Sequence, residues 1–308
     1  MNFKNNSNID IIKLFEDFNK KETPDEIIFM SYKIRKDLEK EIFNSKSYSF
    51  GSYKFKIIIN FLQNKDINYG SEIDILDILV NLYDDDYVVN IPINIKDEKV
   101  NINKLIGIIS HELRHLYDIL NINEIEIKDF MKKRNFNSFI KDDYYKFIFQ
   151  IYLTLEHELI ARNNMIYTSL RWSGMKNKKE LINNYKTMYT YSSLIDLKNF
   201  NYLDFVKSFD ENFLIEKTNK FIKEIANSNE YCNDMKDLLY FYKKWDIFFE
   251  NKANEYLNHA LKEIDKVYDD IIKNKIYESK FLFSHDGYNI NIIEKFFDKW
   301  YKEMFRKE

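Results

Sequence analysis

Hydrophobic and polar positions alternate most clearly at residues 89–95, which read Val-Asn-Ile-Pro-Ile-Asn-Ile. A period of two with β-branched residues on one face predicts a β-strand. Because Pro92 has no N–H to offer a neighbouring strand, we expect this strand at a sheet edge. Residues 53–62 (YKFKIIINFL) predict a second, buried strand, whereas residues 74–83 fit either a helix or a strand.

Helical spacing begins soon after the strand pattern ends. Four hydrophobic residues recur at i, i+4, i+7 and i+11 and predict the buried face of a helix, with Asn103 as its N-cap: Ile109, Leu113, Leu116 and Leu120. A second helical run is predicted at about residues 142–170. Helical periodicity also marks residues 10–48, where Pro24 is placed to open a helix, and the apolar stripes after residue 203 indicate core packing.

The predicted fold class is therefore α+β, mainly α. We expect an α+β lobe at residues 1–125, which carries the edge strand and the first helix above, and a mainly helical lobe at residues 126–308. The chain has 308 residues, of which 45% are hydrophobic and 17% aromatic, enough for a sizeable core. Only two prolines and five glycines occur, which favours helices over loop-rich β structure.

Charge and cysteine content narrow the possible functions. A net charge of −3 gives no global basic field for nucleic acid. The single Cys232 excludes an intrachain disulfide and a cysteine-based zinc cluster. No secretory signal and no apolar run of about 18 residues is visible in the sequence. We expect a soluble cytoplasmic protein with no nucleic-acid or membrane partner.

The predicted helix contains the pentad His111-Glu112-Leu113-Arg114-His115. Residues four apart share a helix face, so both imidazoles can reach one metal ion, on the side opposite Ile109 and Leu113. Glu112 would lie beside that ion, where it could take a proton from water. The alternative is a helix with two ordinary surface histidines.

A catalytic zinc site needs a third protein ligand. The segment 153–162 offers Glu156, His157 and Glu158 within the second helical run. Glu156 and Glu158 lie about 200° apart on a helix, so only one of them can face the metal. Ala161 is one turn after Glu158, and a small residue there would let two helices approach closely. Glu156, or His157 in a three-histidine site, remains the alternative.

Together the two segments, HELRHLYD and the later ELIAR, resemble the gluzincin zinc metallopeptidases. The resemblance covers approximately residues 85–165 and is to phage- and bacterium-encoded members and to catalytic domains of the lethal-factor type. It implies Zn²⁺ held by His111, His115 and Glu158, with Glu112 as the general base. This group often stabilises the oxyanion with a Tyr or His, for which Tyr152 is the first candidate and His285 another.

The resemblance further implies that the strand at residues 89–95 pairs with an extended peptide substrate, and the alternative is an ordinary edge strand. Asp118 and Arg162 would orient the ligands, or else form plain surface ion pairs. The predicted function is a zinc metallopeptidase acting on peptides or proteins. The alternatives are an amidase or peptidoglycan hydrolase, and a non-enzymatic interaction protein on a zincin scaffold. We also consider a phage-encoded protein that acts in a host cell. Nothing in the sequence predicts the oligomeric state.

Overall fold

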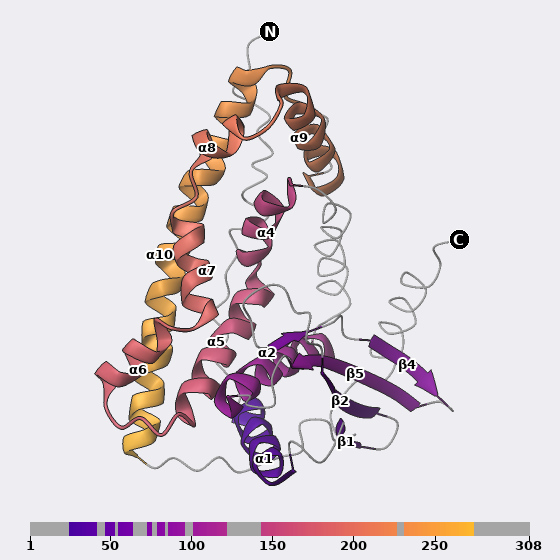
Figure 1. The fold of residues 1–308 in the computed structure, drawn as a ribbon, viewed down its shortest axis with the longest axis vertical. Coiled ribbons are helices and arrows are strands. Elements are labelled where there is room, and N and C mark those ends of the chain that lie inside the picture. The colour runs from indigo at the N-terminus through magenta and orange to yellow at the C-terminus, as the bar shows by residue number, and fades with distance from the viewer. Residues whose placement is uncertain are drawn as a thin grey trace. The chain divides into compact units, whose positions relative to one another are not determined.

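The computed structural model describes nine segments of the chain, and Figure 1 traces them. These segments are residues 25–41, 47–52, 55–63, 73–75, 79–83, 86–95, 101–121, 143–226 and 231–273. They fall into two compact units. The first contains the described residues of Lys128–Asn163 and Lys178–Asp265, and the second contains those of Glu22–Ile127, Asn164–Asn177 and Lys266–Glu308.

The second unit contains a mixed sheet whose order is β1-β2-β5-β3, with β4 also paired to β5. β2 and β5 are parallel, and the other pairs are antiparallel. The strand predicted at residues 89–95 is confirmed, and the strand predicted at 53–62 is confirmed over residues 55–62. In the ambiguous segment, residues 74–75 and 79–83 form strands. Residues 53–54 and 76–78 lie outside the described residues. The bounds are β1 Ser47–Ser52, β2 Phe55–Gln63, β3 Ile73–Ile75, β4 Leu79–Tyr83 and β5 Asp86–Ile95.

The expected edge position of the strand with Pro92 is wrong. β5 pairs with β2 on one side and with β3 and β4 on the other, so it lies inside the sheet. On the second side Ile75 pairs with Ile93 and Leu79 pairs with Asn90. Pro92 therefore lies opposite Asn60 of β2 and between the last described pair of the β3 ladder and the first described pair of the β4 ladder. A substrate strand cannot pair with β5 at that edge.

Two helices of the second unit are α1 (Asp25–Glu41) and α2 (Ile102–Asn121), which pack against each other. On α2, Ile109 and Leu113 are fully buried as predicted, and the side chains of Leu116 and Leu120 lie outside the described residues. The N-cap is Asn101, not Asn103. The Asn101 side chain accepts hydrogen bonds from the backbone N–H groups of residues 103 and 104, at 3.0 and 3.3 Å.

The first unit is helical, and an aromatic cluster forms its core. Phe147 lies within 4.9–5.6 Å, centroid to centroid, of Phe205, Tyr242 and Trp245. These rings join distant parts of the chain, since burial of large apolar side chains drives such packing. The described helices of this unit are α4 Tyr145–Leu153, α5 Glu156–Arg171, α6 Lys178–Tyr185, α7 Tyr189–Lys198, α8 Tyr202–Lys207, α9 Glu211–Ala226 and α10 Met235–Ile272. The last residues of α5 and of α10 belong to the second unit.

The helical run predicted at residues 142–170 is interrupted at Thr154 and Leu155. The Thr154 side chain and backbone N–H both bond to the carbonyl of Ile151, which ends α4. Leu159 N–H then bonds to the carbonyl of Leu155, which starts α5. The break places Glu158 in the first turn of a new helix, where the helix dipole favours a carboxylate.

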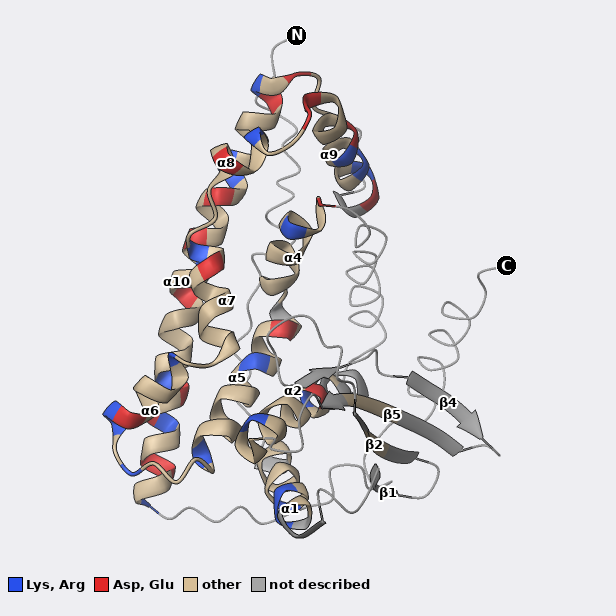
Figure 2. Cartoon of the chain, in the orientation of Figure 1, with Lys and Arg blue, Asp and Glu red and all other residues tan. Residues whose placement is uncertain are grey.

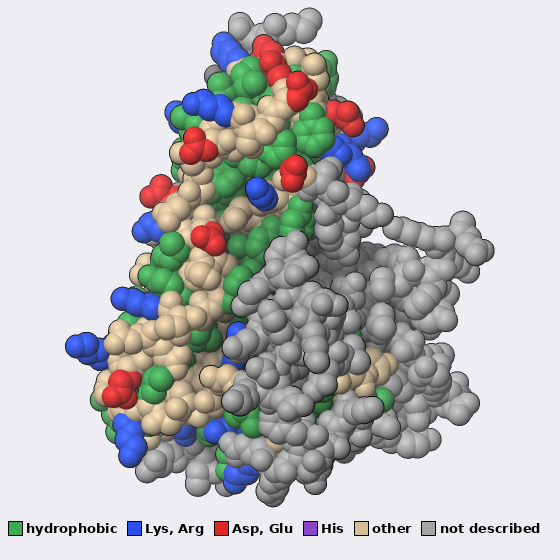
Figure 3. Space-filling model, in the orientation of Figure 1, with side chains coloured by type: hydrophobic (Ala, Val, Ile, Leu, Met, Phe, Trp, Pro, Cys, Tyr) green, Lys and Arg blue, Asp and Glu red, His purple; other side chains and the backbone are tan. Residues whose placement is uncertain are grey.

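The described residues are thus α+β and mainly α, as expected. The expected helical lobe, residues 126–308, contributes to both units, because residues 164–177 belong to the same unit as the sheet and α2. The division into lobes 1–125 and 126–308 stays a prediction. Lys and Arg are interspersed with Asp and Glu along α9 and α10 (Figure 2), and on the face seen in Figure 3 charged side chains are scattered among hydrophobic ones. No helix in the described segments is long and apolar enough to cross a membrane.

Candidate metal centre

His111 and His115 project from one face of α2. Their Nε2 atoms lie 3.1 Å apart, and the rings meet edge to face with centroids 4.7 Å apart. The i, i+4 spacing produces this pairing, since one helical turn brings the two side chains together. The two nitrogens therefore already converge on one point.

Glu112 lies next to this pair. Its Oε1 is 4.0 Å from Nε2 of His111, and the side chains of Glu112 and His111 are 13% and 15% exposed. A carboxylate in this position reaches the immediate surroundings of the convergent nitrogens and keeps access to solvent. This is the position expected of a general base acting on water beside a metal.

α2 packs against residues 164–169 of α5, which belong to the same unit. A methyl group added at Gly107 would lie 1.9 Å from Oγ of Ser169 and 3.2 Å from Met165. One turn later Ser110 Oγ donates to the backbone carbonyl of Asn164 at 3.4 Å. Gly107 thus lies opposite Ser169, and Ser110, further along α2, lies opposite the earlier residue Asn164 on α5. The two helices are therefore antiparallel and in very close contact at Gly107.

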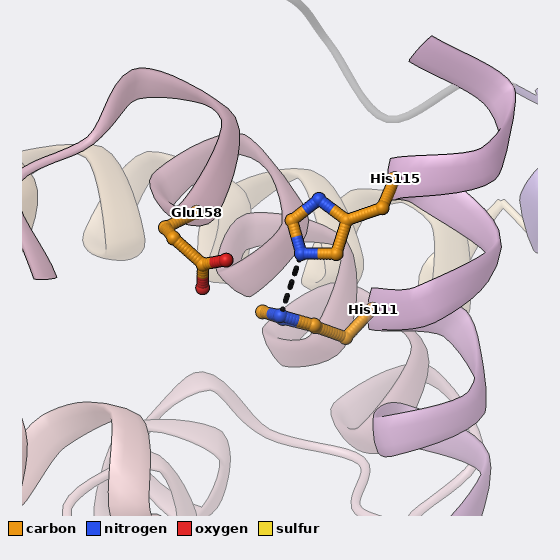
Figure 4. Close-up of side chains that lie close together, drawn as sticks. All are labelled: His111, His115 and Glu158. Atoms are coloured by element: carbon orange, nitrogen blue, oxygen red, sulfur yellow. Dashed lines mark hydrogen bonds between the residues drawn. The ribbon is translucent and has the colours of Figure 1, made fainter. Parts of the chain in front are cut away.

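Glu158 lies six residues before Asn164, in the first turn of α5. Glu158 is 3% exposed, and its carboxylate and the two imidazoles offer ligand atoms within 4.8 Å of one another. Figure 4 shows the two rings and the carboxylate turned toward one another. Among the residues described, no other group of three such side chains converges in this way.

The donor set fits zinc. Two imidazole nitrogens and one carboxylate oxygen match a catalytic site that keeps a fourth position open. Tetrahedral ligands at the usual zinc distances lie about 3.3 Å apart, close to the 3.1 Å between the Nε2 atoms of His111 and His115. The Glu158 carboxylate is at most 4.8 Å from them and would close in by no more than about 1.5 Å to complete the set.

Tyr152, at the end of α4, holds the Glu158 carboxylate by donating its hydroxyl proton to Oε1. His157 Nε2 lies 3.8 Å from the same oxygen. His157 therefore lies beside the Glu158 carboxylate but does not join the convergent group of three. The structure brings together the five residues that the sequence analysis predicts for the metal and catalytic site: His111, Glu112, His115, Tyr152 and Glu158. Their roles in metal binding and catalysis stay proposals.

Other nominated residues are placed differently. The guanidinium of Arg162 donates to Ser193 Oγ at 3.0 Å, rather than to Glu158. The side chains of Asp118 and Glu156, and all of His285, lie outside the described residues.

Gly107 is the site residue that the sequence reasoning missed. It is one turn before His111 on α2, and the absence of a side chain lets α5 approach. A glycine inside an otherwise strong helix pattern was the available signal, because it costs about 1 kcal/mol relative to alanine and so points to a packing reason.

Searches against protein-family models, curated proteins and solved structures gave no match to this chain. The interpretation of the centre therefore depends on its geometry and on the motif resemblance alone.

Proposed function

We propose that this chain is a zinc-dependent metallopeptidase of gluzincin type. The observation that supports it is the convergence of His111, His115 and Glu158 within 4.8 Å, with Glu112 beside them. A site with three protein ligands and a neighbouring carboxylate is the arrangement that hydrolytic zinc centres use. When bound, zinc would polarise the scissile carbonyl and make water acidic enough to lose a proton near neutral pH.

Each residue of the candidate centre has its own role in the proposed reaction. His111, His115 and Glu158 hold the ion. Glu112 accepts the proton from the attacking water and returns it to the leaving amine. Tyr152 keeps the Glu158 carboxylate in place through its hydrogen bond, which favours one orientation of that ligand.

Peptide hydrolysis is the reaction that the motif resemblance favours among those open to this donor set. An amidase would use the same machinery on another amide. A binding protein that descends from an enzyme has no need of Glu112, so an intact base beside the histidine pair favours catalysis over a purely structural role.

The test is hydrolysis of a mixed-sequence quenched peptide library by zinc-loaded protein, with Glu112→Gln as the key variant. Glu216→Gln is the matched control, since it makes the same change at an exposed position on α9. We expect wild type and Glu216→Gln to cleave peptide, and Glu112→Gln to lose at least about a hundredfold in rate while it keeps its metal. Equal rates for wild type and Glu112→Gln would contradict the assigned base. No cleavage by wild type, with metal bound, would contradict a peptidase.

A further inference from the structure

Arg162 on α5 is a nearly buried cation with an uncharged partner. The residue is 7% exposed, and its guanidinium donates to Ser193 Oγ on α7. In the described segments, no carboxylate lies within ion-pairing distance of it. A buried charge is costly unless an opposite charge accompanies it. The missing partner is therefore an anion.

Two buried hydroxyl groups nearby also lack partners. Tyr185 OH and Thr190 Oγ1 belong to residues that are each 2% exposed, and neither makes a hydrogen bond within the described part of the chain. Burial and the neighbouring Tyr191 raise the pKa of the Tyr185 hydroxyl, and the positive charge of Arg162 lowers it. The guanidinium of Arg162 is therefore close to this phenol. Thr190 is one turn before Ser193, whose Oγ donates to the Thr190 carbonyl at 3.1 Å.

The start of α7 adds to this concentration of donors. Met188 is the N-cap residue and its side chain makes no capping hydrogen bond. The first-turn N–H groups and the positive end of the helix dipole therefore lie beside Thr190 and Ser193, and both favour an anion. The observation that points to a ligand remains the buried Arg162, together with the unpartnered Tyr185 hydroxyl.

We propose that Arg162, Tyr185, Thr190 and Ser193 form a subsite for a carboxylate of the substrate. All four residues belong to the first unit. Arg162 is one helical turn from Glu158, about 6 Å along the axis.

The inferred substrate class rests on the proposed peptidase function. Consecutive peptide residues are about 3.8 Å apart, so a carboxylate one or two residues from the scissile bond would reach Arg162. Its source is an Asp or Glu side chain, or a C-terminal carboxylate. Both share the planar anion that a guanidinium binds through paired hydrogen bonds.

Calorimetric titration of the full chain with N-acetyl-aspartate and with N-acetyl-asparaginamide, which carries no carboxylate, tests the subsite directly. The titration is run with and without zinc, so it does not depend on catalysis. We expect wild type to prefer the acid by at least about tenfold. Arg162→Gln should abolish that preference, and Arg171→Gln, the same change at the other end of α5, should keep it. Equal or undetectable binding of the two probes by wild type would overturn the proposal.

Tyr185→Phe guards against misreading a folding defect. This change removes only a hydroxyl without a partner in the described segments, so we expect the melting temperature to stay within about 2 °C of wild type. The affinity for N-acetyl-aspartate should nevertheless fall about three- to tenfold. An unchanged affinity in both Tyr185→Phe and Arg162→Gln would show that the anion binds elsewhere and would overturn the proposal.

Peptide cleavage then identifies the source of the carboxylate. Faster cleavage of peptides with an internal Asp or Glu than of their Asn or Gln counterparts supports a side chain as the source. Loss of cleavage on C-terminal amidation supports the terminal carboxylate. Failure of all cleavage would count against the peptidase, and the calorimetry would still decide the subsite.

Discussion

The hydroxyl of Tyr152 donates a hydrogen bond to Oε1 of Glu158, the carboxylate that faces His111 and His115. The break between α4 and α5 makes this contact possible, because it separates the helix that carries the phenol from the helix that carries the carboxylate. Tyr152 is therefore placed to position the Glu158 carboxylate, whereas the motif resemblance implies contact with the reacting peptide. The two roles give different results on mutation.

Tyr152→Phe should weaken zinc binding about tenfold to a hundredfold, because ligand-orienting partners contribute that much to metal affinity. Competition with a chromophoric chelator measures the affinity, and Tyr145→Phe on the same helix is the control. An unchanged zinc affinity with a reduced kcat would instead assign Tyr152 to the reacting peptide.

Gly107→Ala should destabilise the protein by about 1–3 kcal/mol, as overpacking of a close contact usually does. The new methyl would lie 1.9 Å from Ser169 Oγ and 3.2 Å from the Met165 carbonyl oxygen, so the Ser169 hydroxyl must rotate away and α5, which carries Glu158, must shift by a few tenths of an ångström. Zinc affinity should fall with stability. Chemical denaturation and chelator competition measure the two effects.

Ser169→Ala provides the matched test of that contact. Ser169 Oγ is buried without a hydrogen-bond partner in the described residues, so its removal alone should change stability little. In the double variant Ser169→Ala should recover part of the loss caused by Gly107→Ala. Strictly additive effects would show that the two residues do not compete for the same space.

Glu158→Ala should reduce zinc affinity by at least about a hundredfold, because it removes one of three protein ligands. Glu156→Ala and His157→Ala should each leave the affinity within about tenfold of wild type. The same chelator competition compares the three. A larger loss in Glu156→Ala or His157→Ala than in Glu158→Ala would move the third ligand to that neighbour.

The sequence predicted most of what local pattern controls. Alternation at residues 89–95 and helical spacing around Ile109 and Leu113 gave the correct elements, since each follows from which side chains must be buried. The sequence also pointed to His111 and His115 on one helix face and to Glu158 on a later helix, and the structure places their ligand atoms within 4.8 Å of one another; their role as metal ligands stays a prediction.

Features that depend on tertiary partners were missed. The interior position of Pro92 depends on β3 and β4 pairing with β5 on the side away from β2, which the alternation at residues 89–95 does not encode. The break at Thr154 depends on a local hydrogen bond that competes with the helix, in a stretch whose apolar spacing runs through without interruption. Asn101 and Asn103 are both good N-caps, and local preference alone does not distinguish them.

The most direct test of the central claim is the bound-metal stoichiometry of wild type, His111→Ala and His259→Ala, purified identically and resupplied with zinc. His259 is the control, because it also lies four residues from a potential ligand, 4.0 Å from Glu255 on α10, but outside the convergent group. We predict one zinc per chain in wild type and His259→Ala, and loss of that zinc in His111→Ala. No zinc in wild type, or equal zinc in all three proteins, would contradict a metal centre at His111, His115 and Glu158.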